Sequence, residues 1–234
     1  MNFLLKVQNL SKHFGGFAAL TEVSLDIAPG ERFGLIGPNG SGKTTLINCV
    51  AGALRNESGT VTFAGEDVTG LPAWQRTRRG IARSFQVPRP FHSMTVLENL
   101  LVPLEYVSGG TTRQALEILG QIGLVDKAAT LSSRLTQVEL RKLELARAMA
   151  ARPRLLISDE AMAGLSPAEV DEVLPILFKL NETGITIVMI EHIMQAVMKF
   201  SQRVICLDAG RIICEGTPQS IVQDAGVQRA YLGA

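Results

Sequence analysis

The chain has 234 residues, a formal net charge of +1 and 46% hydrophobic residues, and none of its apolar runs approaches the ~20 residues of a membrane-spanning helix. The near-neutral charge gives no electrostatic case for nucleic acid, which proteins attract with basic surfaces. Three cysteines without metal-ligand spacing are typical of free thiols in a reducing compartment. Length and composition therefore favour one globular domain with a large core.

Strand patterns dominate the start of the chain. Apolar runs predict strands at residues 4–10 and 23–27, and a turn over residues 11–17, which carries Phe14, lies between them. This phenylalanine could stack on a nucleotide base, or it could be a core or hairpin residue, and its spacing alone favours the core or hairpin position. A third strand is predicted at residues 33–36, and a helix follows over residues 46–54.

A glycine-rich loop joins that strand to that helix, with the sequence Gly37-Pro38-Asn39-Gly40-Ser41-Gly42-Lys43-Thr44-Thr45. The pattern Gly-x-x-x-x-Gly-Lys-Thr, placed between a strand and a helix, predicts the phosphate-binding loop of a nucleoside triphosphatase. Glycines let backbone N–H groups approach phosphate, and the helix N-terminus adds unpaired donors. Lys43 is then expected to reach the β- and γ-phosphates, and Thr44 to ligate Mg²⁺.

A strand, a helix and another strand are predicted next, at residues 59–63, 71–79 and 81–85. The helix carries three arginines that we expect to face solvent: Arg76, Arg78 and Arg79. The last strand ends at Gln86, before a loop stiffened by two prolines. Gln86 could face a metal ion or water from this position, or it could be an ordinary loop residue.

Only helix signals follow over residues 87–151. Three threonines, each three residues before Glu or Gln, form capping boxes: Thr95 with Glu98, Thr111 with Gln114, and Thr136 with Glu139. The predicted helices end near residues 101, 122 and 151. We therefore expect a helical subdomain at 87–151, inserted into an α/β catalytic core made of residues 1–86 and 152–234.

Two later strands end in polar residues. The strand at 155–160 ends in Asp159, expected to hold Mg²⁺, and Glu160, expected to activate the attacking water; the alternative is a strand simply ended by acids. After a helix at 166–181, the strand at 186–190 ends at Glu191 and His192. Parallel sheets bind ligands at this edge, so His192 could contact one, although a structural histidine is the commoner case. A hairpin, 203–208 with 211–215, and a short helix complete the prediction.

Together these residues resemble the nucleotide-binding subunit of an ATP-binding cassette (ABC) transporter over nearly the whole chain. The resemblance implies a single ABC ATPase domain over 1–234, with a RecA-like core, an antiparallel β subdomain and the helical insertion. It makes residues 37–44 the Walker A motif, and the strand ending at Asp159 and Glu160 the Walker B motif.

The resemblance also assigns roles that spacing alone leaves open. Gln86 matches the Q-loop glutamine, which contacts Mg²⁺ and the attacking water, and His192 matches the switch histidine near the γ-phosphate. Phe14 matches the aromatic residue that stacks on adenine, which reverses the preference from spacing. The groove near Gln86, Pro88 and Pro90 is expected to receive the coupling helices of membrane subunits.

One motif departs from the family pattern. The signature Leu-Ser-Gly-Gly-Gln, which binds the γ-phosphate of ATP held by the opposite subunit, aligns with Leu135-Thr136-Gln137-Val138-Glu139. Thr136 keeps a hydroxyl and is expected to bind that nucleotide, but Val138 replaces a glycine and Glu139 adds a negative charge. Thr136 and Glu139 could instead cap their own helix. The family implies a second ABC ATPase subunit, and this signature favours a different, intact partner over a second copy.

A narrower resemblance is to the ATPases of branched-chain amino-acid importers, carried by 83–86, 94–99, Ile190-Glu191-His192 and the ending Ala230-Tyr231-Leu232-Gly233. It implies ATP hydrolysis with Mg²⁺ at the cytoplasmic face of the membrane, driving uptake of branched-chain amino acids or a related small polar solute. The implied partners are integral membrane permease subunits and a solute-binding protein. The rivals are a soluble ABC ATPase outside transport and a weakened cassette that acts mainly by ATP-dependent dimerisation.

Overall fold

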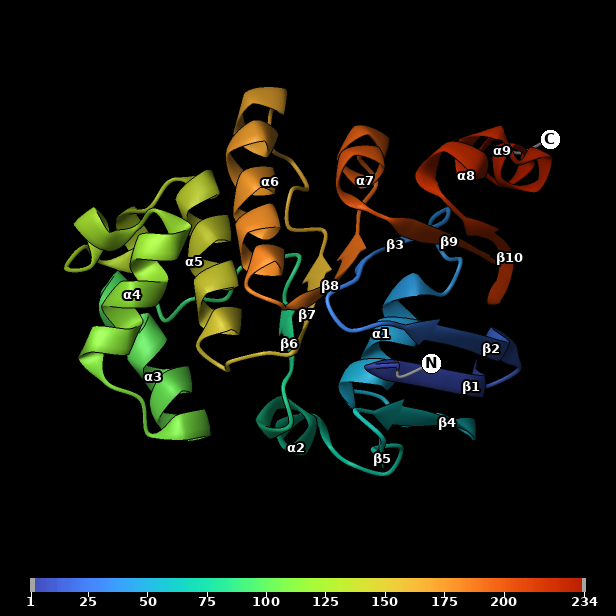
Figure 1. The fold of residues 1–234 in the computed structure, drawn as a ribbon, viewed down its shortest axis with the longest axis horizontal. Coiled ribbons are helices and arrows are strands. Elements are labelled where there is room, and N and C mark those ends of the chain that lie inside the picture. Colours follow the sequence, from blue (N-terminus) through green and yellow to red (C-terminus); the bar gives the residue numbers. More distant parts are fainter. Residues whose placement is uncertain (1–2, 233–234) are drawn as a thin grey trace.

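A six-stranded sheet forms the centre of the computed structural model (Figure 1), which describes residues 3–232 and thus leaves out Gly233 of the C-terminal resemblance. Its strand order is β10-β9-β3-β8-β7-β6. The bounds are β3 (Arg32–Ile36), β6 (Ile81–Ser84), β7 (Leu155–Asp159), β8 (Thr186–Ile190), β9 (Arg203–Asp208) and β10 (Arg211–Gly216). All neighbours pair in parallel except β9 and β10, so the carboxyl ends of five strands meet at one edge.

A second, antiparallel sheet has the order β2-β1-β4-β5, with β1 (Leu5–Phe14), β2 (Phe17–Ile27), β4 (Ser58–Phe63) and β5 (Glu66–Asp67). The predicted turn over residues 11–17 is wrong: β1 and β2 pair as far as Phe14 and Phe17, so only Gly15 and Gly16 turn. Shifts of register within the hairpin hide this from the sequence, because each one breaks the alternation of buried and exposed residues.

The helices lie on both faces of the central sheet (Figure 1). On one side, α1 (Lys43–Ala51) and the antiparallel sheet share a core with alternate residues of the central strands, such as Ile157 and Val188. On the other side, α5 (Gln137–Met149), α6 (Pro167–Glu182) and α7 (Met194–Phe200) pack on the intervening residues, such as Leu156 and Ile187. This two-sided burial explains why β7 and β8 are continuous apolar runs.

The segment 87–151 contains α3 (Val96–Ser108), α4 (Thr112–Ile122) and α5, with short 3₁₀ turns η1 (Val125–Lys127) and η2 (Ser132–Arg134). All three predicted capping boxes form. Helix α3 continues seven residues beyond its predicted end and contains Pro103. Its last turns persist because Leu104 is fully buried, and packing of this kind outweighs the local cost of proline.

Arg76 contradicts the prediction of a solvated arginine face. It lies on α2 (Ala73–Arg78), is 1% exposed, and donates to the carbonyls of Cys49 and Val50 at 2.8 Å. It also donates to Leu71 and Thr69 at 2.9 and 2.8 Å. The last carbonyls of a helix have no partner within it, so this side chain completes the end of α1.

The chain ends in α8 (Pro218–Gln223) and α9 (Ala225–Leu232), which lie beside β9 and β10 (Figure 1). Within residues 3–232, no helix is both long and apolar enough to cross a membrane.

Candidate nucleotide-binding site

The glycine loop runs from the end of β3 to the first turn of α1, which begins at Lys43, three residues earlier than predicted. Gly42 precedes the helix with φ 106°, a conformation that favours glycine. At Gly37 a Cβ atom would stand 2.1 Å from the carbonyl oxygen of Leu207, so no other residue fits. The strand, the loop and the helix therefore have the arrangement that the motif predicts.

Lys43 is 6% exposed and donates from Nζ to the carbonyls of Gly37 at 2.7 Å and Pro38 at 2.9 Å. Burial lowers the pKa of Lys43, while the nearby carboxylates of Glu160 and Asp159 act in the opposite direction. A buried cation that donates hydrogen bonds to neutral carbonyls is poised to interact with an anion, because phosphate oxygens compensate its charge better than neutral groups do.

Three predicted site residues come together at the ends of β6, β7 and β8. Gln86 donates from Nε2 to Oε2 of Glu160 at 2.5 Å, and His192 Nε2 lies 3.0 Å from Oε1 of the same carboxylate. Glu160 has φ 48°, a strained conformation for a residue other than glycine. The parallel order β8-β7-β6 produces this cluster, because it aligns the carboxyl ends of strands that are far apart in the sequence.

One open pocket brings the loop and the cluster together. It is lined by Phe14, Phe17, Ala19, Asn39, Gly40, Ser41, Gly42, Lys43, Thr44, Thr45, Glu160 and His192. Phe14 is 49% exposed at the end of the β1–β2 hairpin, so the core position is wrong, whereas the hairpin position is confirmed. Phe17, which the sequence did not single out, is its cross-strand partner and is 62% exposed. Pairing across the Gly15-Gly16 turn is the signal that would have revealed it.

The three residues predicted to hold Mg²⁺ are Thr44, Gln86 and Asp159, which carry a hydroxyl, an amide and a carboxylate oxygen. Asp159 is 5% exposed, and its Oδ2 accepts from Arg83 at 2.5 Å. Mg²⁺ favours hydroxyl, carbonyl and carboxylate oxygens, and it commonly uses one or two carboxylates together with phosphate oxygens. The described residues contain no cluster of three or more His, Cys, Asp or Glu that could hold a metal. The oxygen types of Thr44, Gln86 and Asp159 are those that Mg²⁺ favours when phosphates complete its coordination.

Two further residues support the cluster and were missed. Glu191 is buried at the end of β8 and accepts from the N–H of Met162 at 2.9 Å; burial raises its pKa to about 7. Arg141 of α5 donates to the carbonyls of Gln86 and Ala163, the latter at 2.9 Å. Arg141 thus ties α5 to the segments after β6 and β7. In the sequence it resembles any arginine of an amphipathic helix, so no local signal marks it.

Thr136 lies outside this pocket, at the N-terminus of α5. Its hydroxyl accepts from the N–H of Glu139 at 3.3 Å, and its own N–H donates to the Glu139 carboxylate at 2.9 Å. Lys127 pairs with that carboxylate at 2.5 Å; burial opposes ionisation of Glu139, but these hydrogen bonds lower its pKa. Val138 is 7% exposed and packs into the core. The start of this helix is therefore occupied by its own capping groups.

Comparisons with known proteins agree with this geometry. A sequence model of the ABC transporter family matches residues 20–163, more than half of the chain. The chain belongs to the ABC transporter family. A second model, of the branched-chain amino acid ATP-binding cassette transporter, matches residues 211–234 of this cassette.

Sequence alignments with known relatives cover almost the whole cassette. It is 37% identical to the high-affinity branched-chain amino acid transport ATP-binding protein LivG of Escherichia coli and 35% identical to BraF of Pseudomonas aeruginosa, each alignment covering 98% of both chains. It is also 34% identical to the lipopolysaccharide export system ATP-binding protein LptB of Haemophilus influenzae, over 98% of this chain and 97% of the relative.

Solved structures confirm the predicted fold. The ADP conformation of MJ1267, an ATP-binding cassette of an ABC transporter, superposes with a TM-score of 0.92 at 31% identity, covering 100% of both chains. A nucleotide-free cassette from an ABC transporter gives 0.92 at 30% identity, over 99% of this chain and 100% of that one. The family and the α/β P-loop fold are therefore as the sequence predicts.

Proposed function

We propose that this cassette hydrolyses MgATP to power the uptake of branched-chain amino acids, or of a related small polar solute, as the ATPase subunit of an ABC importer. One observation carries the enzymatic part: Lys43 and Glu160 line the same pocket, and Glu160 is held by Gln86 and His192. The transport part is supported by the similarity to LivG and BraF and by the branched-chain match at residues 211–234.

The pocket supports a division of labour among its residues. The loop N–H groups and Lys43 bind the phosphates and stabilise the negative charge of the transition state. Thr44, Gln86 and Asp159 hold Mg²⁺, which neutralises phosphate charge when bound. These roles follow from the types and positions of the side chains, and mutation of each one tests them.

Glu160 is the general base in this proposal. Gln86 and His192 orient its two carboxylate oxygens, so the carboxylate is fixed before water attacks. His192 lines the pocket and is expected to contact the γ-phosphate, and the exposed ring of Phe14 is expected to stack on the adenine. In this proposal the helices of residues 87–151 form a subdomain of a single ATPase domain, and Gln86 directly precedes that subdomain.

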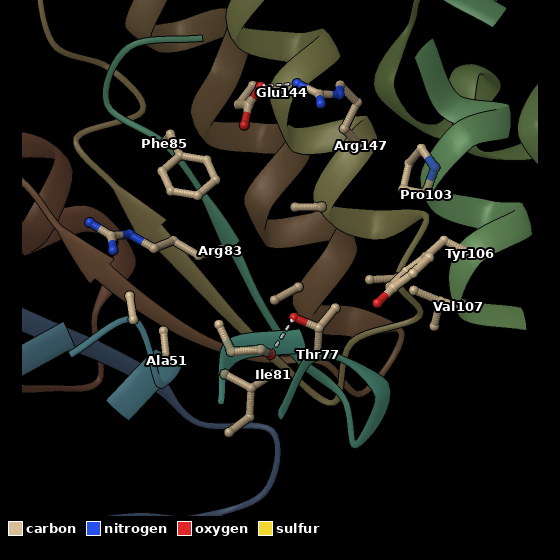
Figure 2. Close-up of a pocket in the computed structure, with 15 residues that line it drawn as sticks. Ala51, Thr77, Ile81, Arg83, Phe85, Pro103, Tyr106, Val107, Glu144 and Arg147 are labelled. Atoms are coloured by element: carbon tan, nitrogen blue, oxygen red, sulfur yellow. Dashed lines mark hydrogen bonds and ion pairs between the residues drawn. The ribbon is translucent and has the colours of Figure 1, made fainter. Parts of the chain in front are cut away.

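An apolar groove provides a docking site for the membrane partners. It lies between α2, β6, α3 and α5, and Figure 2 shows Phe85, Pro103 and Tyr106 around it. The groove begins one residue before the predicted position near Gln86, Pro88 and Pro90, none of which lines it. Phe85 directly precedes Gln86, so a helix seated here would push on the segment that contacts Glu160. We assign this groove to the coupling helices of integral membrane permease subunits, which places the cassette on the cytoplasmic face of the membrane. A solute-binding protein completes the proposed importer, and nucleic acid has no part in it.

The partner ATPase in this proposal is a different subunit. The capping box occupies the N–H groups of Thr136 and Glu139, and the Glu139 carboxylate, paired with Lys127, stands where a signature segment meets phosphate across a dimer. A homodimer would carry two such weakened sites, whereas a heterodimer keeps one strong site. Replacing the general-base glutamate of each subunit in turn tests this, because the two replacements must reduce ATP turnover unequally.

The decisive experiment compares ATP turnover and MgATP binding in the wild type, Glu160→Gln and the control Glu117→Gln, an exposed carboxylate on α4. We expect Glu160→Gln to lower turnover at least about 100-fold while MgATP still binds, because a general base contributes roughly that factor. The control should match the wild type. Full turnover in Glu160→Gln would refute the proposed mechanism.

Protein concentration and membrane partners extend the same assay. Turnover that rises faster than linearly with concentration indicates a competent homodimer, whereas activity only with a second subunit indicates a heterodimer. Uptake of labelled leucine into proteoliposomes with the permease subunits tests the transport step. Leucine uptake that does not depend on Glu160 would contradict coupling.

A further inference from the structure

Residues from the C-terminal part of the chain contact the phosphate-binding loop at three points. The hydroxyl oxygen of Tyr231, on α9, accepts the N–H of Gly37 at 2.8 Å. The carbonyl of Leu207, on β9, closes the space beside the same glycine. The N–H of Gly210, in the β9–β10 turn, donates to the carbonyl of Ser41 at 2.9 Å. Both ends of the loop therefore rest on the C-terminal segment.

Tyr231 and Lys43 form hydrogen bonds with the two backbone polar groups of Gly37. Tyr231 takes its N–H, and Lys43 donates to its carbonyl at 2.7 Å. In the proposed function Lys43 turns to the phosphates when nucleotide binds, so it no longer restrains this carbonyl. Burial raises the pKa of the Tyr231 phenol, so the hydroxyl is neutral at physiological pH and its oxygen accepts the N–H of Gly37. Tyr231 then remains as the polar contact that anchors the start of the loop.

Two family models match different parts of the chain. The match to the ABC transporter family ends at residue 163, whereas the match to branched-chain cassettes covers residues 211–234. That second match contains α8, α9 and Tyr231. A segment that matches the branched-chain cassette model is thus joined by a hydrogen bond to the phosphate-binding loop.

We propose that Tyr231 is a positioning residue of the nucleotide site, which holds the start of the phosphate-binding loop in its binding conformation through the N–H of Gly37. It acts through Gly37 and does not touch the reacting atoms. The role rests on the proposed nucleotide function. Removing the hydroxyl leaves the N–H of Gly37 without this partner, and the loop must then be ordered at the expense of binding. A hydrogen bond of ordinary strength predicts about three- to tenfold weaker MgATP binding.

The test uses Tyr231→Phe, which deletes one oxygen atom, and Arg229→Gln, an exposed control on the same helix. Three quantities are measured: MgATP affinity, hydrogen exchange of the Gly37 amide in the nucleotide-free protein by NMR, and the midpoint of thermal unfolding. Tyr231→Phe should bind MgATP about three- to tenfold more weakly and exchange the Gly37 amide faster, with turnover at saturating ATP nearly unchanged. The control should behave as the wild type.

Two results would overturn the role. Unchanged MgATP affinity in Tyr231→Phe refutes it, even where thermal stability falls, because that pattern is expected of a packing residue alone. An unchanged exchange rate at Gly37 also refutes it. If the wild type binds no nucleotide, the proposed function falls together with this role. If the wild type and Tyr231→Phe bind MgATP equally well, only this role is overturned.

Discussion

Arg76→Ala gives a sharp test of how α1, the helix that carries Lys43 and Thr44, is held in place. The substitution removes the guanidinium that donates to four carbonyls at 2.8–2.9 Å, of which the two at the end of α1 are buried and the other two are half-buried. Each buried acceptor that loses a hydrogen bond costs about 1 kcal/mol and a half-buried one less, so the loss in unfolding free energy is about 2–4 kcal/mol. That is a large fraction of the ~5–15 kcal/mol typical of a domain.

Urea unfolding of Arg76→Ala, Arg79→Ala and the wild type measures this difference. Arg79 makes a surface pair with Glu66 at 3.2 Å, with side chains 39% and 70% exposed, so its loss should cost no more than about 1 kcal/mol. The two arginines lie three residues apart, and local sequence does not distinguish them. Equal losses for the two variants would refute the argument that Arg76 completes the end of α1.

Three further predictions concern the site. Burial raises the pKa of Glu191 to about 7, above the 4.5 expected in the unfolded chain, so stability should fall as pH rises from about 4.5 through 7, by about 3 kcal/mol in total. Glu191→Gln should abolish that fall in urea melts at pH 5 and pH 8; an unchanged slope would contradict it. Phe17→Ala and Phe14→Ala should each weaken ATP binding about tenfold but leave the binding of inorganic triphosphate unchanged, because only ATP has a base to stack. Equal losses of affinity for both ligands would argue against stacking. Arg141→Lys should slow single-turnover hydrolysis about tenfold with little change in MgATP affinity, since an ammonium cannot bridge two carbonyls as a guanidinium does. Normal hydrolysis in that variant would exclude the link.

Local patterns predicted most elements of the fold. The glycine loop, the three capping boxes and the apolar strands at 155–159 and 186–190 lie where the sequence places them. Each of these depends on residues within a few positions of one another. The hairpin at residues 5–27 and the end of α3 were predicted less well, because register shifts and tertiary packing set their limits.

The sequence alone determined the family, the P-loop fold and the list of chemical groups, since phosphate binding requires particular residue types at fixed spacing around Lys43. Only the tertiary structure decided which groups meet. It joined Gln86, Glu160 and His192 through the order of three parallel strands, buried Arg76 while leaving Arg79 exposed, and brought Tyr231 to a glycine 194 residues earlier. The physical reason is that burial and hydrogen bonding between distant segments depend on how sheets and helices pack, and short sequence patterns do not contain that information.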